Sequence, residues 1–248
     1  MRLTGALPPP SLAGLATSRK SPACEGGGHL LGFTQALLLL IFAAVALGAD
    51  RPVALDTSHL DLRGVKAEAV QYRGRTALKL VEASQSEEPA LAVLKNVMLR
   101  DGTIQIEVSG APAAGAVEGA RGFVGVAFRV APEAKRFEYI YLRPTNGRVD
   151  DQVRRNHSVQ YASHPDFPWP RLRKEEPEKY ESYVDLEPGV WTKMRVVISG
   201  RTARLYVHGA AQPTLVVTDL KIEPAQGAIA LWIGPGTVGH FSNLVVSE

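Results

Sequence analysis

From residue 50 onward the sequence consists of short runs in which apolar and polar residues alternate, separated by turn residues. Asp101-Gly102, for example, leads into Thr103-Ile-Gln-Ile-Glu-Val108, where Ile104, Ile106 and Val108 share one face of an extended strand. No stretch shows the long apolar period of about 3.6 residues that an amphipathic helix needs. The pattern therefore predicts strands and gives no helices that could connect parallel ones.

About ten such strands are expected in about 200 residues, a density typical of a sandwich. They are residues 66–72, 76–81, 103–108, 122–130, 137–142, 191–198, 202–208, 214–218, 228–233 and 240–246. Strands without crossover helices pair antiparallel, so the predicted fold class is all-β, a two-sheet antiparallel jelly-roll sandwich. No linker divides residues 50–248, which we expect to form a single domain.

Residues 143–190 interrupt this pattern with few strand signals and many charged and aromatic residues. Long insertions in a compact domain are usually functional or disordered. Aromatic side chains are scarce in disordered segments, but this one contains Phe167, Trp169 and three tyrosines. We therefore expect a folded loop insertion that lies over one face of the sandwich.

The longest apolar run is Ala36-Leu-Leu-Leu-Leu-Ile-Phe-Ala-Ala-Val-Ala46. At about 11 to 14 residues it is shorter than the roughly 20 needed to cross a bilayer. Basic residues precede it and small residues end it, which is the pattern of a secretory signal peptide. The sequence predicts a signal peptide over residues 1–49 with a long n-region, and an exported, periplasmic or extracellular protein with no stable membrane span after cleavage. An uncleaved membrane anchor and a buried helix are the alternatives.

Removal of this leader changes the charge and the cysteine count. The full chain has 28 basic and 25 acidic residues, and three basic residues (Arg2, Arg19, Lys20) but only one acidic residue (Glu25) precede residue 50. The mature chain would then carry a net charge of +1, which argues against nucleic acid as a partner. Cys24 is the sole cysteine, so neither a disulfide nor a thiolate zinc site is expected.

Several short sequence segments occur in a characteristic order in the predicted domain. They are Gly125-Val-Ala-Phe-Arg129, Tyr139-Ile-Tyr-Leu-Arg-Pro144, and the segments 191–200, 203–207, 213–220, 227–234 and 241–246. This succession resembles the concanavalin A-like lectin/glucanase superfamily over roughly residues 53–248. It looks nearest to the 3-keto-disaccharide hydrolase-like and laminin-G-like exported bacterial domains. The resemblance implies a jelly roll whose concave face often holds carbohydrate, with the insertion 143–190 over that face.

The sequence departs from two sites of this superfamily. Laminarinase-type members carry Glu-x-Asp-x-x-Glu on one strand, whereas Glu138-Tyr-Ile-Tyr141 lacks the second and third carboxylates. A retaining glycosidase needs two carboxyl groups about 5 Å apart. The metal site of legume lectins needs an Asp/Asn-rich loop, and Asp150-Asp151 near Asn146 is a minimal match for calcium. The histidines lack metal-binding spacing, so no other metal or cofactor is expected.

The expected ligand-binding residues are arginines, aromatics and one carboxylate: Arg129, Tyr141, Arg143, Asp151, Tyr161, Trp169 and Arg173. Arginines and Asp151 would hydrogen-bond sugar hydroxyls, because the planar guanidinium suits such contacts. Tyr161 and Trp169 would stack on sugar rings. The alternatives are arginines that point to solvent, aromatics that anchor the loop on the sheet, and Asp151 as a turn residue.

Three functions stay open at this stage. The first is an exported module that binds carbohydrate on the concave face. The second is a glycoside hydrolase or lyase of the 3-keto-disaccharide hydrolase-like type, in which Asp151, His157 or Glu181 would act as catalytic acid or base beside Arg129. The third is a laminin-G-like protein-interaction or envelope scaffold module. No Gly-x-Ser-x-Gly or phosphate-loop motif occurs, and the sequence does not fix the oligomeric state.

Overall fold

The structure is a computed structural model that describes residues 49–83 and 89–248. The expected signal peptide over 1–49 lies outside the described residues, except for Ala49. None of the helices in the described ranges is long and apolar enough to cross a membrane.

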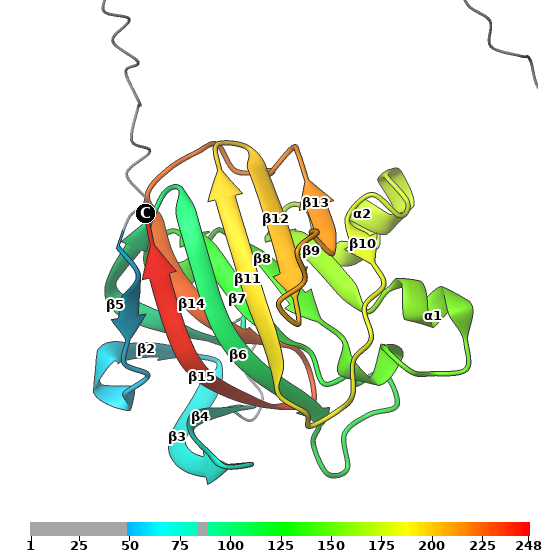
Figure 1. The fold of residues 1–248 in the computed structure, drawn as a ribbon, viewed down its shortest axis with the longest axis horizontal. Coiled ribbons are helices and arrows are strands. Elements are labelled where there is room, and N and C mark those ends of the chain that lie inside the picture. Colours follow the sequence, from blue (N-terminus) through cyan, green and yellow to red (C-terminus); the bar gives the residue numbers. More distant parts are fainter. Residues whose placement is uncertain (1–48, 84–88) are drawn as a thin grey trace, which may run out of the picture. The chain divides into compact units, whose positions relative to one another are not determined.

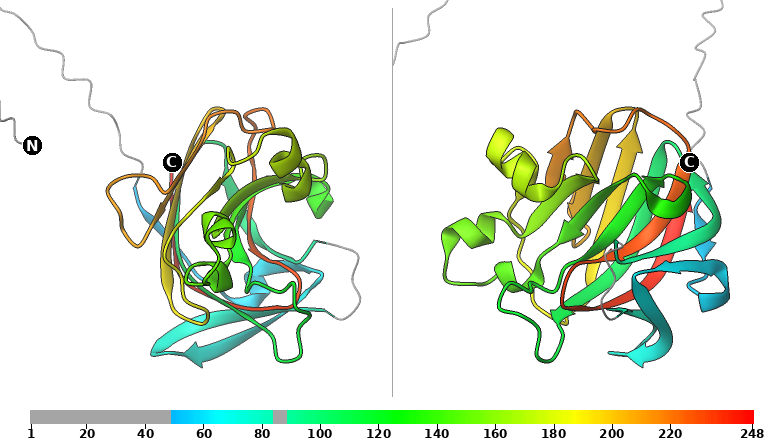
Figure 2. Two further views of the ribbon diagram at one scale, coloured as in Figure 1. Left: turned by 90° about the vertical axis from the view of Figure 1, so that its right-hand side faces the viewer. Right: turned by 180° about the vertical axis from the view of Figure 1, so that it is seen from behind.

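Two antiparallel sheets face each other in this part of the chain (Figures 1 and 2). The eight-stranded sheet has the order β13-β12-β11-β6-β15-β4-β3, with β1 paired to β15. Its strands are β1 (Arg51–Val53), β3 (Val65–Tyr72), β4 (Arg75–Glu82), β6 (Gly102–Pro112), β11 (Thr192–Ser199), β12 (Thr202–Val207), β13 (Leu215–Val217) and β15 (Thr237–Ser247).

The seven-stranded sheet has the order β10-β9-β8-β7-β14-β5-β2. Its strands are β2 (Leu60–Arg63), β5 (Leu91–Leu99), β7 (Val124–Val130), β8 (Phe137–Leu142), β9 (Val159–His164), β10 (Glu181–Ser182) and β14 (Gly227–Ile233). All pairings in both sheets are antiparallel, which confirms the predicted two-sheet antiparallel sandwich.

The core lies between the sheets, where the predicted alternation places apolar side chains. Ile104, Ile106 and Val108 of β6 are all buried and belong to one apolar cluster with Phe128 of β7 and Ile140 of β8. Burying each such side chain contributes roughly 1.5–3 kcal/mol. β7 and β8 are buried on both faces, because aromatic side chains also cover the outer face of the seven-stranded sheet.

A buried ion pair crosses this core. The Glu138 carboxylate is fully buried and accepts hydrogen bonds from Arg129 (3.2 Å), from the Tyr161 hydroxyl (2.7 Å) and from the Ile222 N–H (3.1 Å). Arg129 also donates to the carbonyls of Ile222 and Gly200. Burial raises the pKa of Glu138, and these donors oppose the rise. The pair joins β7, β8 and β9 to turns of the opposite sheet.

The structure corrects the expected orientation of Arg129. Strict alternation along β7 would place this side chain on the outer face, but its φ of +51° breaks the alternation. The register between β14 and β7 shifts at the same place, which marks a β-bulge. The guanidinium therefore turns into the core, and its side chain is 1% exposed.

Residues 143–190, expected as a loop insertion, contain two short helices and two strands of the seven-stranded sheet. The segment contains a 3-10 turn (Pro144–Asn146), α1 (Gln152–Asn156), β9, α2 (Trp169–Glu175) and β10. Two further 3-10 turns lie at Thr57–His59 and Pro132–Ala134. Asp151 begins α1 by accepting a hydrogen bond from the Arg154 N–H, and Pro168-Trp-Pro170 begins α2. Figure 1 shows both helices on the side of the sandwich where β9 and β10 lie.

Candidate functional site

A hollow of about 320 Å³ lies where the segment before β7 meets the end of β8 and the start of α2. Its lining combines cationic, aromatic and amide side chains: Gly119, Arg121, Phe123, Arg143, Asn146, Arg154, His157, Trp169 and Arg173. We call it the arginine hollow. A larger groove of about 610 Å³ follows β1, β4 and β15, but its lining contains no charged side chain. Binding sites combine an apolar surface with a few converging polar groups, so the arginine hollow is the stronger site.

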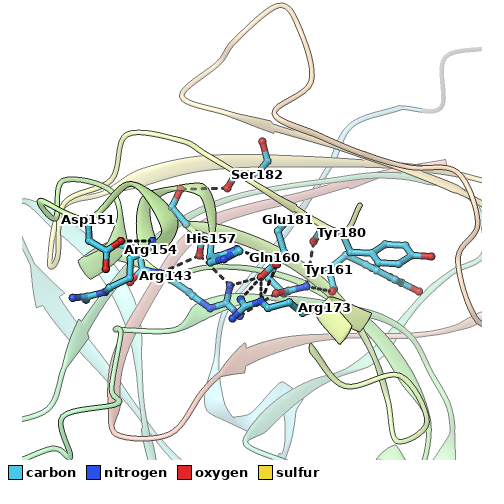
Figure 3. Close-up of polar contacts among 12 residues, drawn as sticks. Arg143, Asp151, Arg154, His157, Gln160, Tyr161, Arg173, Tyr180, Glu181 and Ser182 are labelled. Atoms are coloured by element: carbon cyan, nitrogen blue, oxygen red, sulfur yellow. Dashed lines mark hydrogen bonds and ion pairs between the residues drawn. The ribbon is translucent and has the colours of Figure 1, made fainter. Parts of the chain in front are cut away.

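Glu181, at the start of β10, holds the base of the arginine hollow together. Arg173 donates to both of its carboxylate oxygens, and Arg143 Nη1 lies 3.4 Å from its Oε1. His157 Nδ1 lies 3.0 Å from its Oε2, without hydrogen-bond geometry. Figure 3 shows these side chains converging on one carboxylate that is almost completely buried. The carboxylate thus fixes two arginines that come from separate elements.

Hydrogen bonds to three further residues hold the Arg143 guanidinium in place. It donates to Gln160 Oε1 at 3.0 Å and to the His157 carbonyl at 3.0 Å (Figure 3). It also donates to the Tyr141 hydroxyl at 2.9 Å. Gln160 is itself held because its amide donates to the Tyr161 and Tyr180 carbonyls. A side chain with this many partners is preorganised, so little conformational entropy is lost when it contacts a ligand in the hollow.

Aromatic side chains continue from the hollow along the outer face of the seven-stranded sheet. Tyr141 stacks on Tyr139 at 5.5 Å between ring centroids and packs on Trp232 at 4.6 Å. Phe123 meets the Tyr141 ring edge-on at 6.1 Å. Burial raises the pKa of Tyr141 to about 12, so its hydroxyl stays protonated. The row forms a rigid wall behind the hollow.

Trp169 is the exposed aromatic of the site. Its ring lies at the first turn of α2, with the Arg173 guanidinium 4.6 Å and the Arg143 guanidinium 5.5 Å from its centroid. The side chain is 40% exposed, which is high for a tryptophan in a folded domain. Cation–π contacts hold the ring while leaving apolar surface available at the mouth of the hollow.

The structure brings four of the seven expected ligand-binding residues together. Arg143, Trp169 and Arg173 line the hollow, and Tyr141 supports Arg143 from below. Tyr161 does not reach it: its ring is fully buried in the core and its hydroxyl accepts a hydrogen bond from the Lys221 N–H. Arg129 is the buried partner of Glu138. The Asp151 carboxylate caps α1 and does not line the hollow.

The three expected acid–base candidates, Asp151, His157 and Glu181, do not all meet in one place. His157 and Glu181 lie next to each other, and both line a second hollow of about 210 Å³. The rest of its lining is Asn156, Glu178, Ser182 and Tyr183. Burial lowers the pKa of His157, and the nearby Glu181 opposes that shift, so the imidazole is neutral at pH 7. Asp151 is engaged at the start of α1. Acid–base catalysis by these residues would have to use Glu181, which is held in ion pairs with Arg143 and Arg173.

No group of three or more His, Cys, Asp or Glu side chains within residues 49–83 and 89–248 is arranged to hold a metal ion. The residues considered for calcium serve other contacts. Asn146 donates to the His157 carbonyl at 3.1 Å, and Asp151 caps α1.

Four residues of this region were missed as ligand-binding candidates in the sequence. Arg121 and Phe123 precede β7 in a segment with no distinctive motif, and Arg154 closely follows Asp150-Asp151, a spacing that suggests a local ion pair. Trp232 lies in the predicted strand 228–233, a position typical of a core residue. A signal did exist, since Trp232 pairs with Gly125, and Gly125 with Tyr141, across neighbouring strands. A glycine between two large aromatics marks the face on which they meet.

Comparisons with known proteins give a fold and no family. No family model matches the chain. No curated protein matches it in sequence.

Solved structures do match. A Bacillus subtilis protein of unknown function with a galectin-like fold has a TM-score of 0.54 at 12% identity, over 82% of this chain and 96% of that one. Carbohydrate-binding module CBM66 from Bacillus subtilis has a TM-score of 0.49 at 11% identity, over 76% and 98%. A Bacillus licheniformis β-glucanase has a TM-score of 0.43 at 12% identity, over 81% and 97%. The match to the galectin-like structure confirms the jelly-roll fold that the sequence resemblance implied.

Proposed function

We propose that this protein is an exported module that binds a carbohydrate in the arginine hollow. One observation carries the proposal: an exposed tryptophan ring stands beside preorganised hydrogen-bond donors at the mouth of a hollow. Trp169 supplies an apolar face that matches the C–H face of a sugar ring. Arg173 and Asn146, which line the same hollow, supply planar polar groups for hydrogen bonds to sugar hydroxyls. A volume of about 320 Å³ is at the lower end of ligand sites, which span about 300–1,000 Å³.

The fold supports this proposal without deciding it. One fold can host many functions, so the likeness to the galectin-like Bacillus subtilis protein does not identify a ligand, and the residues of the hollow carry the proposal. The third function, a protein-interaction or envelope scaffold, needs no hollow of this kind. It would leave the exposure of Trp169 and the fixed arginines around it without a purpose.

Hydrolysis of a glycoside is the second function that a specific observation favours. Glu178 and Glu181 line the second hollow together with His157, so two carboxyl groups and an imidazole share one surface. Hydrolysis needs one carboxyl group that is free to exchange a proton. Glu181 is engaged with Arg143 and Arg173, which favours a positioning role for it over a catalytic one.

Binding of an oligosaccharide panel by the purified domain tests the proposal, with Trp169→Ala as the key variant. We expect millimolar or tighter binding of at least one panel member by calorimetry. Truncating a tryptophan anchor costs about 2 kcal/mol or more, so the variant should bind about 30-fold more weakly. Tyr206→Ala is the matched control, because Tyr206 is an aromatic on β12 of the opposite sheet that packs under Arg195.

Three outcomes separate the functions. Loss of binding in Trp169→Ala with retention in Tyr206→Ala supports the proposal. Binding by neither wild type nor variants contradicts it and favours the scaffold. Release of shorter products from a bound oligosaccharide, abolished in Glu181→Gln, would favour the hydrolase.

Export is the other part of the proposal. It is supported by the apolar run at 36–46 and the small residues that follow it, within the leader predicted over residues 1–49. We expect that the protein expressed from the full sequence in a bacterial host is recovered outside the cytoplasm and begins near residue 50. Intact-mass measurement of the recovered protein checks this, and a full-length mass in the cytoplasmic fraction would contradict it.

A further inference from the structure

The arginine hollow has more positive than negative charge. Four arginines line it, and no carboxylate is part of its lining. Glu181 at its base compensates Arg143 and Arg173 together. His157 adds no charge at pH 7, because burial lowers its pKa.

Two of the four arginines have no carboxylate partner among the described residues, namely Arg121 and Arg154. Arg121 donates only to the carbonyls of Glu118 and Ala120, and the charge of Glu118 acts on it from nearby. Arg154 makes no side-chain hydrogen bond with any described residue, and its Nε atom is buried without a partner. Asn146 Oδ1 is also buried without a partner in the same lining. Buried polar atoms that lack partners in a protein usually meet them in a ligand or in water.

The arginines also repel one another. Burial lowers the pKa of Arg121, and the positive charges of Arg154 and Arg143 lower it further. Like charges gathered without counter-charge destabilise the fold, so an arrangement of this kind needs a compensating benefit. An anion seated among them would remove the repulsion and satisfy the free N–H groups at once.

We propose that the arginine hollow selects saccharides that carry an anionic group, a carboxylate or a sulfate, over neutral ones; this inference rests on the proposed carbohydrate function. The planar guanidinium groups of Arg121 and Arg154 bind the anion through charge-assisted hydrogen bonds. Trp169 packs on the ring that carries it. Asn146 Oδ1 accepts a hydrogen bond from a neighbouring hydroxyl.

The positive charge is local, which favours a small acidic ligand over a polyanionic surface partner. Several basic residues outside the hollow are paired with carboxylates: Arg148 with Asp185 and Glu187, and Lys179 with Glu176 and Asp219. Arg171, on the same helix as Trp169, pairs with Glu175. These basic side chains are compensated by carboxylates, whereas Arg121 and Arg154 in the hollow have no such partner among the described residues.

The test uses matched pairs of oligosaccharides, one member with acidic groups and the other with those groups absent or esterified. Oligogalacturonides, oligomannuronates and glucuronate-containing oligosaccharides are each compared with their neutral methyl esters, and sulfated galactose oligomers with the unsulfated ones. We expect the wild-type domain to bind an acidic member at least about 10-fold more tightly than its neutral partner, since one charge-assisted hydrogen bond is worth about that factor. Salt should weaken only the acidic member, because it screens exposed charge.

Arg154→Gln is the informative variant, because the Arg154 side chain makes no hydrogen bond or ion pair with a described residue that the substitution would break. We expect it to weaken binding of the acidic member about 10-fold more than it weakens binding of the neutral partner, so that the preference for the acidic member is lost. Arg121→Gln should do the same. Arg171→Gln removes the same charge from an ion pair outside the hollow and should change neither affinity by more than about 2-fold.

The outcomes distinguish this inference from the function on which it rests. Preference for a uronate or for a sulfate supports the inference and identifies the anion. Equal binding of acidic and neutral partners overturns the inference and leaves carbohydrate binding intact. Failure of every member, acidic or neutral, overturns the carbohydrate function and this inference with it.

Discussion

Replacing Arg129 with methionine is expected to lower the free energy of unfolding by about 3–5 kcal/mol, a large share of the stability of a domain this size. The reason is the carboxylate left behind. Glu138 is fully buried, so without Arg129 its charge would lose its only ion-pair partner within the described residues. Methionine fills a similar volume, which keeps the effect electrostatic and avoids a large cavity.

The double variant Arg129→Met/Glu138→Gln separates charge from packing. Glutamine keeps an oxygen that can accept from the Tyr161 hydroxyl and the Ile222 N–H but carries no charge. We therefore expect the double variant to be at least about 1 kcal/mol more stable than Arg129→Met alone. Urea denaturation of the three proteins measures this. A loss below about 1 kcal/mol in Arg129→Met would mean that water reaches Glu138 and that the pair is not buried in solution.

Replacing Gly125 with alanine is expected to lower the free energy of unfolding by about 3 kcal/mol and to disturb the wall behind the hollow. A Cβ at this position would lie 2.6 Å from Tyr141 Cα and closer still to the Ile140 carbonyl oxygen. Both belong to the neighbouring strand, which cannot move without breaking its pairing with β7. Tyr141 would be displaced from Trp232, and with it the hydroxyl that holds Arg143.

Gly119→Ala is the matched control, because Gly119 also lines the hollow and a Cβ there would meet nothing within 4 Å. It should unfold within about 0.5 kcal/mol of wild type. Denaturation curves together with near-ultraviolet circular dichroism, which reports on the packing of Tyr141 and Trp232, distinguish the two variants. Equal stability of both would show that β7 and β8 are not as closely paired as described.

Ten of the fifteen strands in the described part of the chain could be predicted because they follow the alternation of apolar and polar residues. Five were missed: β1, β2 and β10 have four residues or fewer, and the longer two, β5 and β9, do not alternate. β5 has a bulge: Asn96 has a φ of +61°, and the pairing with β14 slips by several residues around it. β9 carries Gln160 and Ser163 among its buried residues, so it does not look apolar. The polar group of Gln160 is buried because Arg143 and the Tyr180 carbonyl satisfy it, and the partners of a buried amide cannot be read from local sequence.

The binding residues could also be predicted only in part, because the sequence does not show which polar side chains turn into the core. Trp169 and Arg173 stand out in a segment that is unusually aromatic and charged, and both line the hollow. Arg129 and Tyr161 stand out equally in sequence, yet both turn to the core, where they meet Glu138. Whether a polar side chain faces the core or the solvent depends on a partner distant in the chain, here on β8. Alternation alone assigns the face only where the strand has no bulge.

The side chains that line the arginine hollow all come from one uninterrupted stretch, residues 119–173. The strands of the eight-stranded sheet lie entirely before or after this stretch in the chain. Recognition and scaffold can therefore vary separately: insertions and exchanges between β6 and β11 change what the molecule recognises while the opposite layer stays as it is. Proteins that share this sandwich could diverge in specificity by altering one contiguous piece, and a chimera that exchanges it between two of them should carry its preference along.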